Sequence, residues 1–320
     1  MEDRISIRGR TARKMVKVAN HLPLPGGKNQ AGQLRARLSQ REKMWECPEH
    51  LQLQQMDMEW FTMELLSRKE SPEEAEANRS ETGIILQLHG GGYYGKLHNT
   101  YRDMAGLYNE LSKGYDVLSV DYRVAPEHPY PAALEDALTA YQWMIGQGYD
   151  KEKIIVAGDS AGGGLALALC LYLRDHNMPL PAGIITMSAW TDLTKSGESY
   201  QENFDIDPIF GGMRDSLVYQ DGYYKDSNPE IPYISPVNGD YHGFPPMLMQ
   251  VGEYEMLLSD TKTVAEHARA AGVIVKEHVY PGMFHVFQMG LLLYPEAKEA
   301  WIEVGRFIRY LRKKEKEEHV

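Results

Sequence analysis

Cysteine and long apolar runs are scarce in this sequence. Only Cys47 and Cys170 occur among 320 residues, and neither stands in a Cys-x-x-Cys pair. A secreted disulfide scaffold needs more cysteines, so we expect a protein of the reducing cytoplasm. The amino terminus lacks the basic-then-apolar pattern of a signal peptide. No run of ~18 apolar residues is present, so we predict no membrane span.

Basic residues are also in the minority. The chain has 34 Lys and Arg against 45 Asp and Glu, a formal net charge of -11. Nucleic acids attract basic surfaces, so this balance argues against a nucleic-acid partner. Hydrophobic residues at 43% and charged residues at 25% are typical of a soluble globular protein. The length allows one large α/β domain or two smaller domains.

The first ~45 residues differ from the rest because they are strongly basic. Apolar positions before and after the Pro-Leu-Pro-Gly-Gly stretch at 23–27 predict short amphipathic helices. We favour a solvated basic face that packs on the acidic body, with a membrane-surface helix as the alternative. The basic residues are Arg4, Arg8, Arg10, Arg13, Lys14, Lys17, Lys28, Arg35, Arg37, Arg41 and Lys43.

From about residue 51, short apolar runs alternate with stretches of helical spacing. This pattern predicts a mostly parallel sheet flanked by helices on both faces. Alternation at Met56, Met58 and Trp60, continuing through 61–66, predicts an antiparallel start to the sheet. Segment 193–240, rich in Asp, Asn, Tyr, Pro and Gly, predicts a helical or loop excursion over the carboxyl edge. The runs are 84–88, 117–120, 154–157, 184–187, 247–251 and 273–275, and the helical stretches include 131–147, 162–174 and 260–271.

The strongest chemical signal is the Gly-Asp-Ser-Ala-Gly motif at 158–162. An apolar strand runs into it and a helix follows at once. Small residues around Ser160 permit a strained turn that exposes the hydroxyl as a nucleophile. The helix that follows directs its amino end at the same place, which favours negative charge there. Gly-x-Ser-x-Gly alone is a weak signal, but the strand before it and the helix after it favour a nucleophile at Ser160.

A second glycine-rich loop, His-Gly-Gly-Gly at 89–92, follows another apolar strand. Consecutive glycines leave backbone N–H groups unobstructed, as an oxyanion hole requires. A tight turn or a phosphate-binding loop is the alternative, but the Gly-Lys-Ser/Thr of a P-loop is absent. We therefore predict an oxyanion hole, with the N–H of Ala161 as a further donor. His89 and Gly90 belong to the same loop, and His89 is expected to orient it.

The general base is predicted from position relative to the strands. His285 lies in a loop just after the last strand pattern, at the edge where Ser160 lies. His278 lies inside that strand and is more typical of a packing or surface residue.

The acid has three candidates, Glu253, Glu255 and Asp260, all after the strand at 247–251. Asp260 suits a helix cap, and Glu253 is close to the strand end and suits a structural role. We favour Glu255, which has the reach to orient an imidazole. The order Ser160, Glu255, His285 is the order of nucleophile, acid and histidine in α/β-hydrolases.

These motifs together resemble the hormone-sensitive-lipase-like branch of the α/β-hydrolases, the bacterial esterases with a His-Gly-Gly-Gly loop. The match rests on segments 89–92, 121–133, 158–163 and 281–285, and covers roughly residues 80 to 305. The resemblance implies an oxyanion hole made by Gly91, Gly92 and Ala161. Many members have an aspartate in an Asp-Pro-Leu context where this chain has Glu255-Met-Leu.

The resemblance also implies a single α/β-hydrolase domain over 1–320 with a helical cap. Cap elements at approximately 1–50 and 193–240 would cover a catalytic core of 51–192 and 241–320. Tyr93 and Tyr94 would wall the acyl pocket and suit short acyl chains, or else pack against the core.

The predicted function is that of a serine carboxylesterase of the acetylesterase type, acting on a small-molecule ester without metal or organic cofactor. An amidase or formamidase, or a carbohydrate deacetylase, is the alternative. A non-catalytic receptor is disfavoured, because plant hormone receptors of this fold have lost the histidine that is present here as His285. The sequence leaves a homo-oligomer open.

Overall fold

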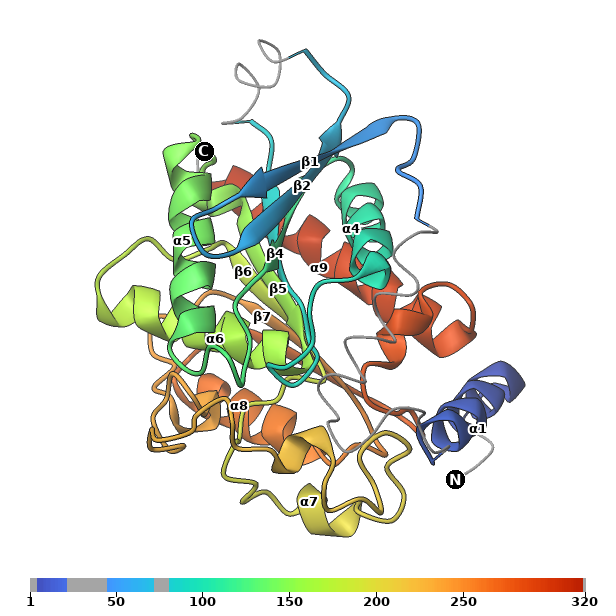
Figure 1. The fold of residues 1–320 in the computed structure, drawn as a ribbon. Helices are drawn as coiled ribbons and strands as arrows, with labels where there is room; N and C mark the ends of the chain where they lie inside the picture. Colours follow the sequence, from blue (N-terminus) through green and yellow to red (C-terminus); the bar gives the residue numbers. More distant parts are fainter. Residues whose placement is uncertain (1–4, 22–44, 72–80, 319–320) are drawn as a thin grey trace.

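A single eight-stranded sheet runs through the computed structural model, which describes residues 5–21, 45–71 and 81–318 (Figure 1). The strand order is β1-β2-β4-β3-β5-β6-β7-β8. β2 pairs antiparallel with both β1 and β4, and all other neighbouring strands are parallel. The strands are β1 Leu51–Asp57, β2 Thr62–Arg68, β3 Ile84–Leu88, β4 Asp116–Asp121, β5 Ile154–Asp159, β6 Gly183–Met187, β7 Met247–Gly252 and β8 Val275–Tyr280.

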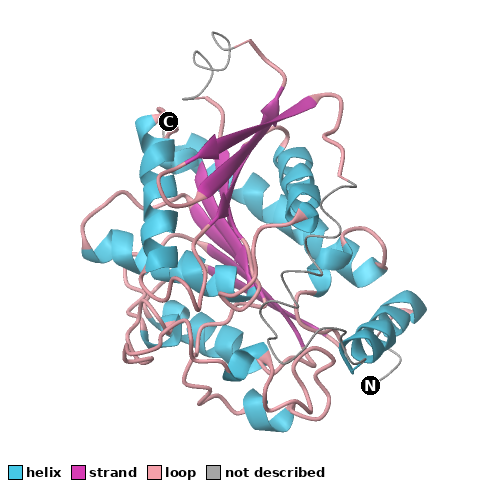
Figure 2. Ribbon diagram, in the orientation of Figure 1, coloured by secondary structure: helices cyan, strands magenta, loops and turns pink. Residues whose placement is uncertain are grey.

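Helices cover both faces of the sheet (Figure 2). α4 and α9 pack on one face, where their apolar residues join those of the sheet in one core cluster. α5, α6 and α8 contribute to the larger cluster on the other face. The predicted mostly parallel sheet flanked by helices is confirmed. The α-helices among the described residues are α1 Ile7–His21, α4 Asn99–Ser112, α5 Ala132–Gly146, α6 Ser160–Asp175, α7 Ser199–Glu202, α8 Leu258–Ala270 and α9 Pro295–Glu318.

The predicted antiparallel start to the sheet is confirmed by β1 and β2. The bounds of two predicted strands differ from the structure. The alternation at Met56, Met58 and Trp60 is not one strand, because the chain turns at 58–61 between β1 and β2. The N–H of Met58 donates to the carbonyl of Phe61 at 2.9 Å, and Trp60 is exposed at the turn. The last strand begins at Val275 and not at residue 273. It is an edge strand whose residues are mostly half-buried, and its sequence VKEHVY contains no continuous apolar run.

Segment 193–240 connects β6 to β7 without a strand. It contains α7 and two 3₁₀ turns, Leu217–Tyr219 and Pro236–Asn238, and is otherwise irregular. The predicted excursion between two strands is therefore present. Figure 1 shows it mostly in yellow at the lower end of the molecule, where it includes α7 and lies beside α8.

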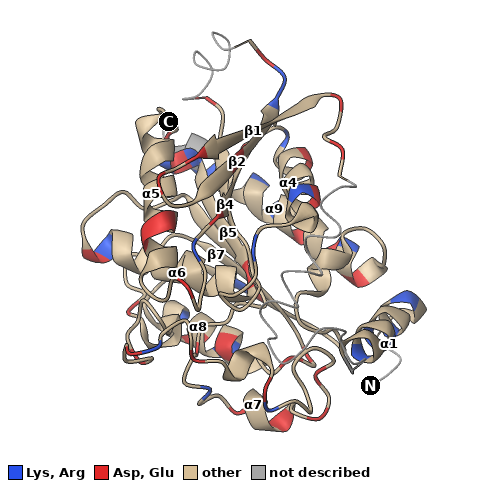
Figure 3. Cartoon of the chain, viewed as in Figure 1, with Lys and Arg blue, Asp and Glu red and all other residues tan. Residues whose placement is uncertain are grey.

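The amphipathic helix predicted before Pro23 is α1. It carries the basic residues seen in Figure 3 and packs on the body beside the start of α9. Arg13 donates from Nη1 to the carbonyl of Gly282 at 3.0 Å and lies over the ring of Tyr254. The second predicted amphipathic stretch, at 34–44, lies outside the described residues. None of the helices within 5–21, 45–71 and 81–318 is long and apolar enough to cross a membrane.

Candidate active site

The Gly-Asp-Ser-Ala-Gly motif forms a sharp strand-to-helix turn. β5 ends at Asp159 and α6 begins at Ser160 with no residue between them. Ser160 has φ 51°, a conformation that costs energy for a residue with a side chain. A Cβ on Gly158 would lie 2.2 Å from the carbonyl oxygen of Gly162. Only glycine at position 158 allows this close approach.

The loops that follow β7 and β8 bring Glu255 and His285 to Ser160. His285 Nε2 lies 2.9 Å from Ser160 Oγ, and His285 Nδ1 lies 3.1 Å from Glu255 Oε2. All three side chains are buried, Glu255 completely. Hydrogen bonds therefore link the hydroxyl, the imidazole and the carboxylate in one continuous line.

Glu255 is positioned relative to His285 by a serine that the sequence did not point to. Ser188 Oγ donates to Glu255 Oε1 at 2.7 Å and accepts from the N–H of Val286 at 3.0 Å. The N–H of Gly252 donates to the same carboxylate oxygen. Ser188 thus joins the acid to the residue after His285. Its only signal in the sequence is its place directly after β6, at the edge where the other residues gather.

The other two acid candidates lie elsewhere. Asp260 is buried in the first turn of α8, where its Oδ2 accepts from the N–H groups of Thr191 and Asp192, both at 2.8 Å. The helix-cap prediction for Asp260 was wrong, because the N-cap position is Leu257. Glu253 Oε2 accepts from the N–H of Gly282 at 2.7 Å, which fits the structural role predicted for it. Neither carboxylate has a hydrogen bond to His285 in the part of the chain that the structure describes.

The glycine loop lies against the nucleophile turn. A Cβ on Gly90 would lie 3.1 Å from Ser160 Cβ, which places the two turns in contact. Gly91 and Gly92 have φ of 102° and 64°, so both need the freedom of glycine. Within the described residues their N–H groups have no acceptor. The N–H of Ala161 lies in the first turn of α6, where helical N–H groups also lack partners.

Comparison with known proteins shows the family to which the chain belongs. A family model described as alpha/beta hydrolase fold matches residues 85–289. The chain is 38% identical over 243 residues to an esterase of Acinetobacter venetianus, covering 73% of this chain and 77% of that protein. It is 36% identical over 231 residues to an acetyl-hydrolase of Streptomyces hygroscopicus, covering 72% and 77%. A crystal structure of an esterase from the bacterial hormone-sensitive lipase family has a TM-score of 0.83 at 32% identity, covering 96% of this chain and 98% of that chain.

The chain belongs to the α/β-hydrolase family, in its hormone-sensitive-lipase-like branch. The resemblance in the motifs is thereby confirmed. The protein is a carboxylic ester hydrolase of the serine carboxylesterase class.

A buried polar cluster supports the glycine loop of the esterase. The ring of His89 stacks on Tyr122 at 4.0 Å, and its Nδ1 lies 2.8 Å from the carbonyl of Gly90. Burial lowers the pKa of His89 to about 3, so the ring is neutral. The hydroxyl of Tyr101 accepts from the N–H of Gly90 at 2.7 Å and donates to Asp159 Oδ2 at 3.1 Å. Tyr101 therefore bridges the glycine loop and the nucleophile turn, a link that the sequence analysis missed.

Asp159 gives the esterase a pH-dependent stability that can be measured. Burial raises the pKa of Asp159 to about 7, so the folded state favours its neutral form. This contribution to the free energy of unfolding is complete below pH ~3.9, the value in the unfolded chain, and is lost as pH rises through 7. Asp159→Asn, which resembles the neutral acid, removes the loss. We expect the free energy of unfolding of wild type to fall by about 2 to 3 kcal/mol more than that of the variant when the pH is raised from 5 to 8, as measured by urea unfolding.

The control is Asp57→Asn on β1, where the side chain is exposed. In this variant the free energy of unfolding should change between pH 5 and pH 8 by the same amount as in wild type. An Asp159→Asn variant with the same pH dependence as wild type would show that Asp159 is ionised in the fold.

The tyrosines that follow the glycines pack against the core and segment 193–240. Tyr93 stacks on Tyr223 at 3.6 Å between ring centroids, and both are fully buried. Tyr94 is also buried, and its hydroxyl lies 2.3 Å from where a Cβ on Gly222 would stand. Of the two arrangements that the sequence left open, the structure has the packed one.

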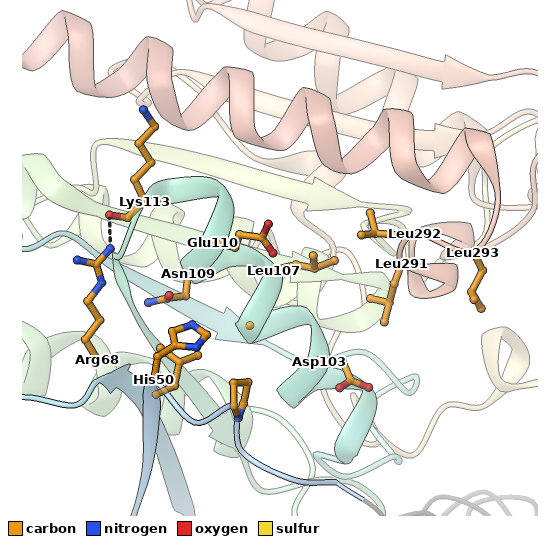
Figure 4. Close-up of a pocket in the computed structure, with 13 residues that line it drawn as sticks. His50, Arg68, Asp103, Leu107, Asn109, Glu110, Lys113, Leu291, Leu292 and Leu293 are labelled. Carbon is orange, nitrogen blue, oxygen red and sulfur yellow. Dashed lines mark hydrogen bonds between the residues drawn. The ribbon is translucent and has the colours of Figure 1, made fainter.

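A separate groove of about 840 Å³ lies on the outer side of α4 (Figure 4). Leu107, Asp103 and Glu110 on α4 line it, facing Pro48, His50 and the loop at 291–293. None of the residues predicted for catalysis lines this groove. It is distinct from the site at the carboxyl ends of β5, β7 and β8.

Proposed function

We propose that this esterase hydrolyses short-chain acyl esters through a Ser160–His285–Glu255 triad and an acyl-enzyme. The observation that carries the proposal is the pair of hydrogen bonds from Ser160 Oγ to His285 Nε2 and from His285 Nδ1 to Glu255. Nucleophile, base and orienting acid are recognised by this geometry and not by their positions in the chain.

In the first half of the reaction His285 Nε2 accepts the proton of Ser160 as the hydroxyl attacks the ester carbonyl. The N–H groups of Gly91, Gly92 and Ala161 donate to the oxyanion that forms, each contributing about 3 kcal/mol. Glu255 holds the Nδ1–H tautomer of His285 and stabilises the imidazolium. His285 then gives the proton to the leaving alcohol as the ester C–O bond breaks.

In the second half water repeats these steps on the acyl-enzyme. His285 accepts a proton from water, the resulting hydroxide attacks the acyl carbonyl, and the proton returns to Ser160 as the carboxylic acid leaves. The steps need neither a metal nor an organic cofactor. Besides water, the chemistry requires only a small-molecule ester as substrate.

The proposal includes a cap over a single α/β-hydrolase domain. Core segments 51–192 and 241–320 would carry the triad, and segments 1–50 and 193–240 would cover it. Two contacts support this division. The ring of Phe210 lies 4.6 Å from the ring of His285, and Leu217 lies 3.2 Å from where a Cβ on Gly92 would stand. Of segment 1–50, residues 5–21 and 45–50 are described.

Short acyl chains are proposed because segment 193–240 approaches both the base and the glycine loop. Phe210 lies beside His285, and Leu217 lies beside Gly92. We infer that both side chains limit the length of the acyl chain. The name of the Streptomyces hygroscopicus relative, acetyl-hydrolase, agrees with a short acyl group.

A rate series tests this substrate class. With nitrophenyl esters from acetyl to decanoyl, we expect kcat/KM to be highest for the shortest chains and to fall as the chain lengthens. The matching acetanilide should react far more slowly than the acetyl ester. A maximum at decanoyl would overturn the short-chain proposal, and an anilide rate equal to the ester rate would favour an amidase. Fast release of acetate from an acetylated sugar would favour a deacetylase.

A further inference from the structure

Segment 199–210 holds the loop that carries Glu255. Ser199, Asn203 and Asp207 stand four residues apart along this segment, and all three are buried. Asn203 Nδ2 donates to the backbone carbonyls of Glu255 at 2.7 Å and Glu253 at 3.1 Å. Two backbone carbonyls of the loop between β7 and α8 are therefore bonded by a side chain from a distant part of the chain.

Asp207 and Ser199 bond the next residue of the same loop. Asp207 Oδ2 accepts from the N–H of Met256 at 2.8 Å, and Ser199 Oγ donates to the carbonyl of Met256 at 2.6 Å. Ser199 Oγ also accepts from the N–H of Ser259 at 2.9 Å. Buried backbone groups without partners are costly, so these bonds add to the backbone bonds of residues 253–254 in fixing the position of the loop.

The second oxygen of Asp207 bonds the backbone of the residue whose ring packs against His285. Asp207 Oδ1 accepts from the N–H groups of Ile209 at 2.7 Å and Phe210 at 3.1 Å. The ring of Phe210 packs against His285. One carboxylate thus connects the residue after Glu255 to the ring beside His285. Asp207 is 1% exposed, and burial raises the pKa of its carboxyl.

We infer that Asn203 and Asp207 are positioning residues that set the distance between the Glu255 carboxylate and His285 Nδ1. The inference rests on the proposed role of Glu255. Neither residue touches the hydroxyl, the imidazole nitrogens or the carboxylate of the triad in the structure as described. They act through the backbone of residues 253–256, where a shift of about 1 Å can cost roughly 10²-fold in rate.

Asp207→Asn is the sharpest test because it keeps the shape of the side chain. An amide has one oxygen, so either Met256 or the pair Ile209 and Phe210 loses its acceptor and faces an N–H₂ group. The matched control is Asp192→Asn. Asp192 is equally buried and accepts from backbone N–H groups of residues 194 and 196, away from the Glu255 loop.

We expect Asp207→Asn to lower kcat by roughly 10- to 100-fold with little change in KM, and Asp192→Asn to keep kcat within about 3-fold. The downfield proton signal of His285 Nδ1–H should weaken in Asp207→Asn alone. If Asp207→Asn does not fold, Asn203→Ala replaces it, because it removes the two bonds to Glu253 and Glu255 and adds no donor clash. Equal losses of kcat in the Asp207→Asn and Asp192→Asn variants would overturn the inference.

A double-mutant cycle separates this inference from the proposed triad. In a Glu255→Ala background, Asp207→Asn should cause no further loss of kcat, since there is no carboxylate left to position. The same loss in both backgrounds would contradict positioning while leaving the triad intact. Full activity of Glu255→Ala by itself would instead overturn the proposed role of Glu255.

Discussion

Ser160→Ala should lower kcat for a short nitrophenyl ester by roughly 10⁶-fold, because it removes the hydroxyl that we propose forms the acyl-enzyme. The variant should fold as wild type. Alanine fits the turn at φ 51° no worse than serine, and the lost hydroxyl bonds only His285 among the described residues. Steady-state hydrolysis and thermal unfolding measured on the same preparation check both parts.

A covalent serine reagent sharpens this test. Wild type should gain one adduct by intact mass, and Ser160→Ala should gain none. Ser119→Ala is the control, since Ser119 is a buried serine on β4 whose hydroxyl donates to Gln87. Wild-type rates from Ser160→Ala, or an adduct on another residue, would remove Ser160 from the mechanism.

Glu255→Ala should lower kcat by roughly 10⁴-fold, the cost when an imidazole loses the carboxylate that fixes its tautomer. Asp260→Ala should instead lower the stability of the fold and leave kcat nearly unchanged. It leaves the N–H groups of Thr191 and Asp192 buried without an acceptor, at about 1 to 3 kcal/mol each. We expect a clear fall in the free energy of unfolding and a kcat close to wild type for the folded fraction.

Measuring both variants by kcat at low temperature and by urea unfolding distinguishes the two roles. If Asp260→Ala loses more kcat than Glu255→Ala, the acid is not Glu255. The comparison is informative because the two carboxylates lie five residues apart in sequence, and both are buried.

The central strands were predictable because they are buried on both faces. Five apolar runs correspond to β3 to β7, since a strand covered by helices on each side is buried along most of its length and is rich in apolar residues. The edge of the sheet was less predictable. β8 consists mostly of half-buried residues and has no continuous apolar run. At the β1–β2 turn the apolar alternation runs across the turn, and alternation alone does not mark where a strand ends.

The environment of the site could not be read from local patterns. Asp260 looked like a helix cap because it follows a serine before a helical stretch, yet its carboxylate bonds a loop after β6. Ser188, Tyr101 and Asp207 carry no motif. Each forms a hydrogen bond with a residue at least eleven positions away in the chain. Such a pair can be identified only when the folded sheet shows which loops lie side by side.

By itself, the sequence determined the chain-local features of this esterase. These are the strand that runs into Ser160, the glycines that let the turn form, and the order of Ser160, Glu255 and His285 along the chain. They are local because sterics and hydrophobic periodicity act over a few residues. Only the tertiary structure decided that Glu255 and not Asp260 lies within hydrogen-bond distance of His285, and that segment 199–210 holds its loop. Such contacts depend on where the ends of separate strands meet, which no single stretch of sequence specifies.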